Sequence, residues 1–169
     1  MAERTAELKR TVEELERENT ERKRAEEELR ETHTELQKTK QYLENLIENS
    51  TEAIIATDRD GKVVLFNKGA EVLSGYRRDE VIGQGAPVLY ESEEDAKEVM
   101  RRMREGDGTV SAFETTFRAK DGTIIPALIS SSMLYDEKGR EAGTVGFSKD
   151  LREFKRAEEQ IRKHSRAVE

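Results

Sequence analysis

The side chains able to do acid–base or metal chemistry are scattered along this sequence. Five acids at the start of its middle third are the candidates, and none stands beside a histidine or cysteine in the spacing of a metal site or catalytic pair. They occupy turns and first helical turns, where acids are ordinarily structural. We therefore expect no enzymatic activity and no metal site. These acids are Asp58, Asp60, Glu71, Asp79 and Glu80.

Cysteine and histidine restrict the chemistry further. The chain has no cysteine, which excludes disulfides, thiolate nucleophiles and sulfur-ligated metals and fits a reducing compartment. Its two histidines, His33 and His164, lie in charged segments with helical periodicity. Both are expected to be helix residues rather than ligands.

Composition predicts one domain with a large solvated surface. The chain has 169 residues, of which 34% are hydrophobic and 40% charged. A net charge of -7 disfavours nucleic acid as a partner. No apolar run approaches the roughly 20 residues of a spanning helix, and MAERTAELKR is not a secretory leader. We expect a soluble, cytoplasmic protein without direct membrane insertion.

Residues 1–48 contain neither proline nor glycine and carry leucines seven residues apart. This spacing predicts a coiled-coil helix, although two second columns fit and the register stays open. Such a stripe is best buried against a second copy in parallel, and a solvated single helix is the alternative. Residues 151–169 show a second helical stripe. The expected dimer seam is Leu8, Leu15, Leu29, Leu36, Leu43, Leu46, Phe154 and Ile161.

Residues 49–150 read as strands and short helices. Turn glycines, Gly61, Gly122 and Gly139, separate alternating apolar runs, which predicts antiparallel strands. Asn67 and Ser92 stand where helix caps are expected. The expected strands are 53–57, 63–66, 111–119, 123–134 and 142–148, and the expected helices are 68–74, 77–82 and 92–105.

One segment, DGKVVLFNKGAEVLSGYRRDEVIG, resembles the PAS sensor-domain family, and RAKDGT and YDEKGREAGTVGFSKD extend the resemblance. The family's pattern is met in order by Gly61, Asn67, Ala70, Leu73, Gly75, Tyr76, Glu80 and Gly83. The resemblance implies an α+β fold: a five-stranded antiparallel sheet with short helices on one face, between a long N-terminal coiled-coil helix and a C-terminal output helix. It also implies a signal-transduction module of bacterial two-component sensors.

The end of the domain carries a signal-relay motif in this family, which usually reads Asp, aliphatic, Thr and often Glu. Here it reads Asp150, Leu151, Arg152 and Glu153. Arginine replaces threonine, so any hydrogen bond made by that hydroxyl must be absent or remade. Asp150 can still cap the output helix.

No cofactor is expected from the comparison with the family. Ala86 occupies the place of the cysteine that forms the flavin adduct in light-sensing members. The helix at 92–105 lacks the axial histidine of haem-binding members. Its Met100 and Met103 fit a hydrophobic core better than an iron site.

Strand alternation and the family alignment together predict a small cavity. Its walls are apolar or weakly polar and would suit a small, mainly uncharged ligand, although an interior packed shut is the alternative. Ala127, Thr144 and Gly146 are also expected to face inward. The expected pocket residues are Ile55, Thr57, Phe113, Thr115, Phe117, Ile129, Ser131 and Ser148.

The resulting expectation is a homodimeric sensor that relays a conformational signal to an effector outside this chain, such as a kinase or cyclic-dinucleotide enzyme. The alternative is a ligand-free dimerisation spacer between sensor domains. The segment IRKHSRAVE lacks the acidic and proline neighbours of a kinase phosphoacceptor, so His164 is assigned to the seam.

Overall fold

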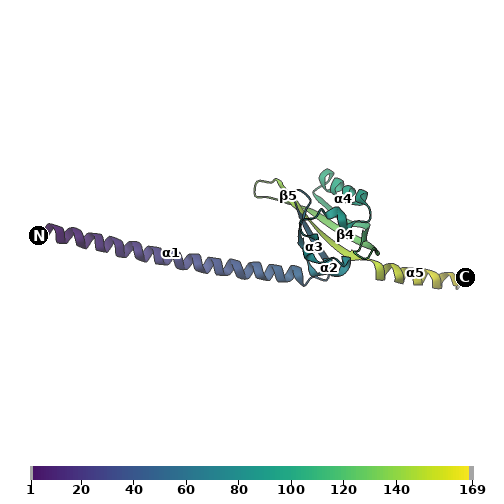
Figure 1. The fold of residues 1–169 in the computed structure, drawn as a ribbon, viewed down its shortest axis with the longest axis horizontal. Helices are drawn as coiled ribbons and strands as arrows, with labels where there is room; N and C mark the ends of the chain where they lie inside the picture. Colours follow the sequence, from purple (N-terminus) through teal and green to yellow (C-terminus); the bar gives the residue numbers. More distant parts are fainter. Residues whose placement is uncertain (1, 168–169) are drawn as a thin grey trace. The chain divides into compact units, whose positions relative to one another are not determined.

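A computed structural model describes residues 2–167, so the last two residues of the expected output helix lie outside it. The chain forms two compact units, one ending at Asn45 and the other beginning at Leu46. Helix α1 (Ala2–Glu48) makes up the first unit and contributes its last residues to the second. Figure 1 shows the elements in order along the chain.

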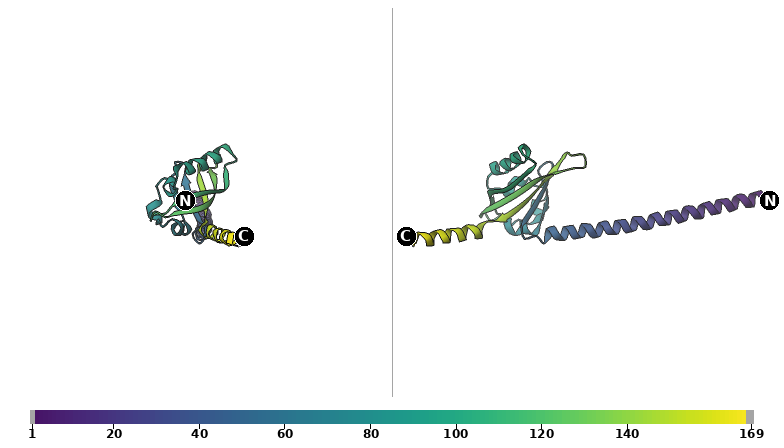
Figure 2. Two further views of the ribbon diagram at one scale, coloured as in Figure 1. Left: turned by 90° about the vertical axis from the view of Figure 1, so that its right-hand side faces the viewer. Right: turned by 180° about the vertical axis from the view of Figure 1, so that it is seen from behind.

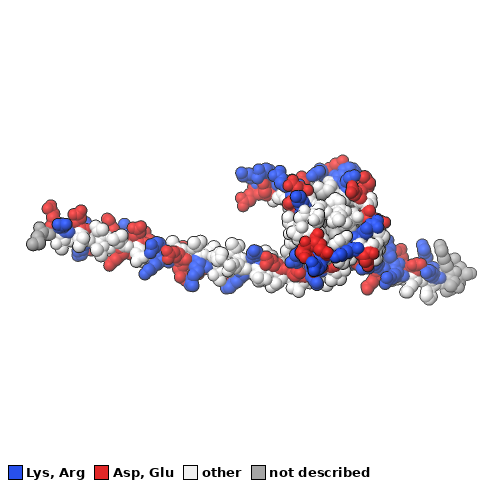
Figure 3. All heavy atoms as spheres, in the orientation of Figure 1, with Lys and Arg blue, Asp and Glu red and all other residues white. Residues whose placement is uncertain are grey.

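Helix α1 buries none of its residues within this single chain. Acidic and basic side chains are interleaved along it (Figure 3), and several pair one turn apart, as Arg30 does with Glu27 at 2.7 Å. Its leucine stripe is open to solvent, with Leu29 70% exposed. Among the described residues, no helix is long and apolar enough to cross a membrane.

The second unit is built on a five-stranded antiparallel sheet, which confirms the expected fold class. The strands lie in the order β2-β1-β5-β4-β3, so the first and last strands of the chain meet at the centre. Figure 2 shows the sheet from two further directions. The strands are β1 Ala53–Asp58, β2 Val63–Phe66, β3 Thr109–Arg118, β4 Ile124–Tyr135 and β5 Glu141–Asp150.

Short helices connect β2 to β3. Asn67 caps the first helix, and Gly75 ends it in the left-handed conformation at φ 74°. Ser92 caps α4, whose apolar side packs on β3 and β4, burying Ala96, Val99 and Met103. The helices are α2 Lys68–Ser74, α3 Arg78–Val81, the 3-10 turn η1 Ala86–Leu89 and α4 Glu93–Glu105, and α5 Arg152–Ala167 follows the sheet.

Strand β3 contains a bulge that the sequence pattern does not predict. Its pairing with β4 shifts between Val110 and Phe113. Within the shift, Ala112 has φ 52°, the one positive φ at a non-glycine residue in the described part of the chain. The bulge changes which β3 side chains face the interior, because each added residue reverses the alternation.

Candidate functional site

A cavity of about 710 Å³ lies between helix α4 and the central strands. Strands β1 and β5 supply one wall, and η1 with α4 supplies the other. Ile55 stands at the middle of the sheet yet is only partly buried, because its side chain borders this hollow. The apolar lining includes Ile55, Leu89, Val99, Met100, Phe117 and Ile129.

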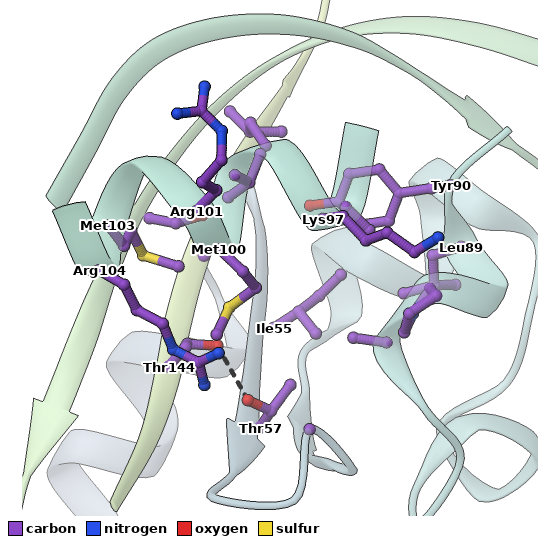
Figure 4. A pocket seen from close by; sticks show the side chains of 18 of the residues that line it. Ile55, Thr57, Leu89, Tyr90, Lys97, Met100, Arg101, Met103, Arg104 and Thr144 are labelled. Carbon is purple, nitrogen blue, oxygen red and sulfur yellow. Dashed lines mark hydrogen bonds between the residues drawn. The ribbon is translucent and has the colours of Figure 1, made fainter. Parts of the chain in front are cut away.

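Strand pairing arranges the polar lining in three rows across the sheet. Ser148 pairs with Ile129, Gly146 with Ser131, and Thr144 with Thr57. Two residues separate successive rows, so the rows from Ser148 to Thr144 cover about 13 Å. In the last row, the Thr57 and Thr144 hydroxyls are 2.9 Å apart and share a hydrogen bond (Figure 4).

Tyr90 closes the side of the cavity opposite the sheet. Its ring packs edge-on against Phe117, with centroids 5.0 Å apart. Burial, and then the nearby Asp95 carboxylate, raise the pKa of Tyr90 to about 12. The hydroxyl therefore stays protonated at neutral pH and can donate a hydrogen bond into the cavity.

A partly exposed ion pair lies on the lining of the cavity, and we call the end of the cavity that it occupies the mouth. Arg104 on α4 lies 3.2 Å from Glu141 at the start of β5, and we call this contact the mouth pair. Figure 4 shows Arg104 pointing toward the end of the sheet where Thr57 and Thr144 lie, whereas Arg101 points away. Arg101 instead pairs with Glu98 and Glu105 on its own helix.

Six of the eight expected pocket residues line this cavity: Ile55, Thr57, Phe117, Ile129, Ser131 and Ser148. Thr144 and Gly146 line it too. Phe113 and Thr115 are absent from the lining. The Thr115 hydroxyl donates to Asp95 at 2.5 Å, and Phe113 follows the bulge, with Arg102 5.0 Å above its ring. Both strand positions lie where α4 packs directly on β3, so no hollow remains there.

The helical wall of the cavity was not predicted from the sequence. Leu89, Tyr90, Met100 and Arg104 line the cavity, but they come from η1, the loop after it and α4. The amphipathic spacing of Ala96, Val99, Met100 and Met103 was the available signal, since it predicts one face directed at the sheet. Arg104 had no such signal, because its role depends on a partner 37 residues away.

Where α1 ends, three side chains form what we call the entry clasp: Glu48, Asn67 and Arg78. Asn67 is 1% exposed. Its amide oxygen accepts from Ile54 N and Ala70 N, and its amide nitrogen donates to Ile47 O and Glu52 O. Arg78 pairs with Glu48 and donates to Phe66 O at 2.7 Å. The clasp therefore joins the end of α1 to β1, β2 and α2.

At the same end of the sheet, where the start of β1 pairs with the end of β5, Asp150 and Arg152 form what we call the exit cap. Asp150 Oδ1 accepts from Arg152 N at 2.8 Å, and the guanidinium of Arg152 donates to both carboxylate oxygens. Burial opposes ionisation of Asp150, but the hydrogen bonds from Arg152 outweigh it, so its pKa lies below the usual value. A guanidinium thus occupies the position of the family's threonine.

The two other relay residues differ in their surroundings. Leu151 is 8% exposed, and its N–H donates to Pro126 O on β4 at 2.9 Å. Glu153 is exposed. The exit cap and Leu151 therefore attach the first turn of α5 to the sheet, and β5 connects them directly to the cavity wall.

The residues of the expected seam remain on the surface of the single chain. The exposed fractions are 68% for Leu8, 51% for Leu43, 63% for Phe154 and 69% for Ile161, and Leu15, Leu29, Leu36 and Leu46 are exposed as well.

Comparison with known proteins identifies the class. Residues 41–151 match the family model of the PAS fold. The chain therefore belongs to the PAS family. A crystal structure of a PAS domain from Colwellia psychrerythraea superimposes with a TM-score of 0.61 at 29% identity, covering 66% of this chain and 95% of that one.

Two proteins similar to this chain in sequence are sensor proteins. The chain is 31% identical over 113 residues to the signal transduction histidine-protein kinase AtoS of Escherichia coli strain K12, covering 67% of this chain and 18% of AtoS. It is 30% identical over 113 residues to the C4-dicarboxylate transport sensor protein DctS of Rhodobacter capsulatus, covering 65% of this chain and 17% of DctS. The chain thus spans less than a fifth of these relatives and has the fold of a signal-transduction sensor module.

Proposed function

We propose that this chain is a homodimeric, non-catalytic sensor whose cavity binds a small molecule and biases the packing of α5. The observation that carries the proposal is the course of β5. This strand supplies Thr144, Gly146 and Ser148 to the cavity wall and ends in the exit cap. A ligand that changes the shape of β5 therefore acts on the start of α5 within a few residues.

Dimerisation through α1 and α5 follows from their uncovered stripes. Each helix exposes large apolar side chains at helical spacing, and packing against a second copy would remove them from water. Packed seams prefer discrete arrangements, so a small change at the exit cap can select between two of them. An effector domain outside this chain would read that choice.

A ligand-free dimerisation spacer is the second candidate. The exposed apolar stripes of α1 and α5 favour this spacer as well, because they need a partner whether or not the cavity is occupied. Two further expectations stay predictions: that the chain lies in the cytoplasm, and that it has no catalytic role. Native mass spectrometry of the purified chain separates the two candidates, since only the sensor retains or takes up a small molecule.

Cross-linking tests the dimer and its relay, and the chain's lack of cysteine makes each introduced thiol unique. Leu43→Cys and Ile161→Cys should each form disulfide dimers. Their controls, Gln41→Cys and Lys163→Cys, lie two residues away on the opposite face of the helix and should cross-link poorly. In the Ile161→Cys background, Arg152→Thr should change the cross-linking yield, because it rebuilds the exit cap.

Equal yields at seam and control positions would contradict a specific parallel dimer. A yield at Ile161→Cys that never responds to Arg152→Thr or to an occupant of the cavity would contradict the relay and leave the spacer.

A further inference from the structure

Two serine residues with little exposed surface face the cavity, and no hydrogen bond joins either hydroxyl to the described part of the chain. Ser131 is 8% exposed and Ser148 is 6% exposed, and neither side chain makes a hydrogen bond to residues 2–167. Both line the cavity. No fully buried side-chain nitrogen or oxygen among the described residues lacks a partner, so both hydroxyl oxygens are reached from the cavity, where they can bond to water or to a polar group of an occupant.

The backbone beside these hydroxyls leaves room for that occupant. Gly146 pairs with Ser131 and with Ile55 across the central strands. A Cβ at residue 146 would lie 3.2 Å from Ser131 Oγ, tighter than ordinary contact. Glycine at this position therefore keeps the middle row of the sheet open to the cavity.

The mouth differs from the deep end in charge. The deep rows offer hydroxyls and apolar side chains, whereas the mouth has charges of both signs, Arg59 and Arg104 together with Asp58, Asp60, Glu105 and Glu141. The other cations of α4 on the cavity lining, Lys97 and Arg101, pair with acids of their own helix. Arg104 pairs with Glu141 from another element, and both side chains are partly exposed, at 58% and 34%. A carboxylate entering the cavity can take the place of Glu141.

We propose that the cavity binds a monocarboxylate with an apolar chain and a hydroxyl or carbonyl group at its far end. The carboxylate pairs with Arg104 in place of Glu141, the chain lies against Ile55, Met100 and Phe117, and the far polar group meets Ser131 and Ser148. A second carboxylate is disfavoured, because the deep end would bury its charge without a cation. This ligand class rests on the proposed sensing function.

Displacement of Glu141 would also connect occupancy to the sheet. Glu141 is the first residue of β5, and Asp150 of the exit cap is the last. An occupant that takes Arg104 therefore releases one end of the strand whose other end holds α5. The mouth pair and the exit cap are the two ends of a single element.

Calorimetric titration of the full chain with matched probes tests the ligand class. The probes share one chain length: ω-hydroxyoctanoate, the dicarboxylate suberate and the uncharged octanediol. We expect ω-hydroxyoctanoate to bind at least about tenfold more tightly than either of the others, the size expected when a charged hydrogen bond is lost or a charge is buried unpaired.

Three variants assign the contacts. Arg104→Gln should weaken ω-hydroxyoctanoate about tenfold and leave octanediol unchanged, whereas the control Arg101→Gln should leave both unchanged. Ser131→Ala should weaken ω-hydroxyoctanoate more than octanoate, which lacks the far hydroxyl. Gly146→Val should abolish binding of every probe. Because Ser131→Ala changes one atom in a buried site, it keeps the test valid if Gly146→Val fails to fold.

Several results would overturn the ligand class. These are equal affinity for octanediol, tighter binding of suberate, no effect of Arg104→Gln, or no binding by any probe, which would leave a cavity for water alone. The relay fails separately: probes that bind but leave the Ile161→Cys cross-link unchanged support the ligand class and remove the signalling step.

Discussion

Asn67 is the residue on which the start of the sensor unit depends most. It is buried and uses both atoms of its amide group in four hydrogen bonds, to Ile47, Glu52, Ile54 and Ala70. A helix cap needs only one of these, the bond to Ala70 N. The other three hold the end of α1 against the first strand.

Replacing Asn67 separates these two roles. Asn67→Ala should lower the free energy of unfolding by about 3 kcal/mol, because buried backbone groups lose their partners. Asn67→Ser retains a capping oxygen and should recover only about 1 kcal/mol of that loss. Urea denaturation measures both values. Full recovery by serine would show that the asparagine is no more than a cap.

The capping role of Asn67 could be predicted from sequence, and the clasp could not. A polar residue before KGAEVLS indicates a helix start, since capping depends only on neighbours along the chain. The bonds to Ile47 and Glu52 depend on where two distant backbone segments lie. The Arg104 to Glu141 contact was unpredictable for the same reason. The inward positions of Ser131 and Ser148 followed from alternation, which is a local property.

At the scale of elements, β5 joins the functional parts. Its inward residues line the cavity, its first residue belongs to the mouth pair and its last to the exit cap. The sequence predicted this strand from its turn glycine and its apolar pattern. Strand β3 was less predictable. The bulge at Ala112 reverses the alternation only before Phe113, and the predicted positions Phe113 and Thr115 miss the cavity because α4 covers them.

The exit cap makes the β5–α5 junction sensitive to acid. The pKa of folded Asp150 lies below that of an unfolded aspartate, about 3.9. Ionised Asp150 therefore stabilises the fold at neutral pH, and this contribution is lost as the pH falls below about 4 through the folded pKa. Asp150→Asn removes the charge but keeps an oxygen that can cap α5.

Urea denaturation at a series of pH values measures this contribution. The wild type should be more stable than Asp150→Asn at neutral pH, and the difference should shrink as the pH falls through the acid range. A difference that stays constant, or grows, on acidification would show that the ionised pair with Arg152 does not stabilise the junction.

At the scale of the whole molecule, the chain carries a hollow domain between two helices with uncovered apolar stripes. The PAS fold and the sensor class are shown by the family match and by the relatives. The dimer and the response of α5 to the cavity are proposals that rest on Leu43, Ile161 and the course of β5. The response of α5, unlike the dimer itself, requires that a change inside one domain alters the packing of two chains.

The most direct test is the distance between spin labels attached at Ile161→Cys in the two chains of a dimer, measured by pulsed electron resonance. Filling the cavity with Gly146→Val should shift the distance distribution at residue 161, whereas labels at Leu43→Cys report whether the dimer itself persists. We expect a redistribution between discrete distances at residue 161. Identical distributions in the open and filled proteins, with the dimer intact, would contradict this expectation.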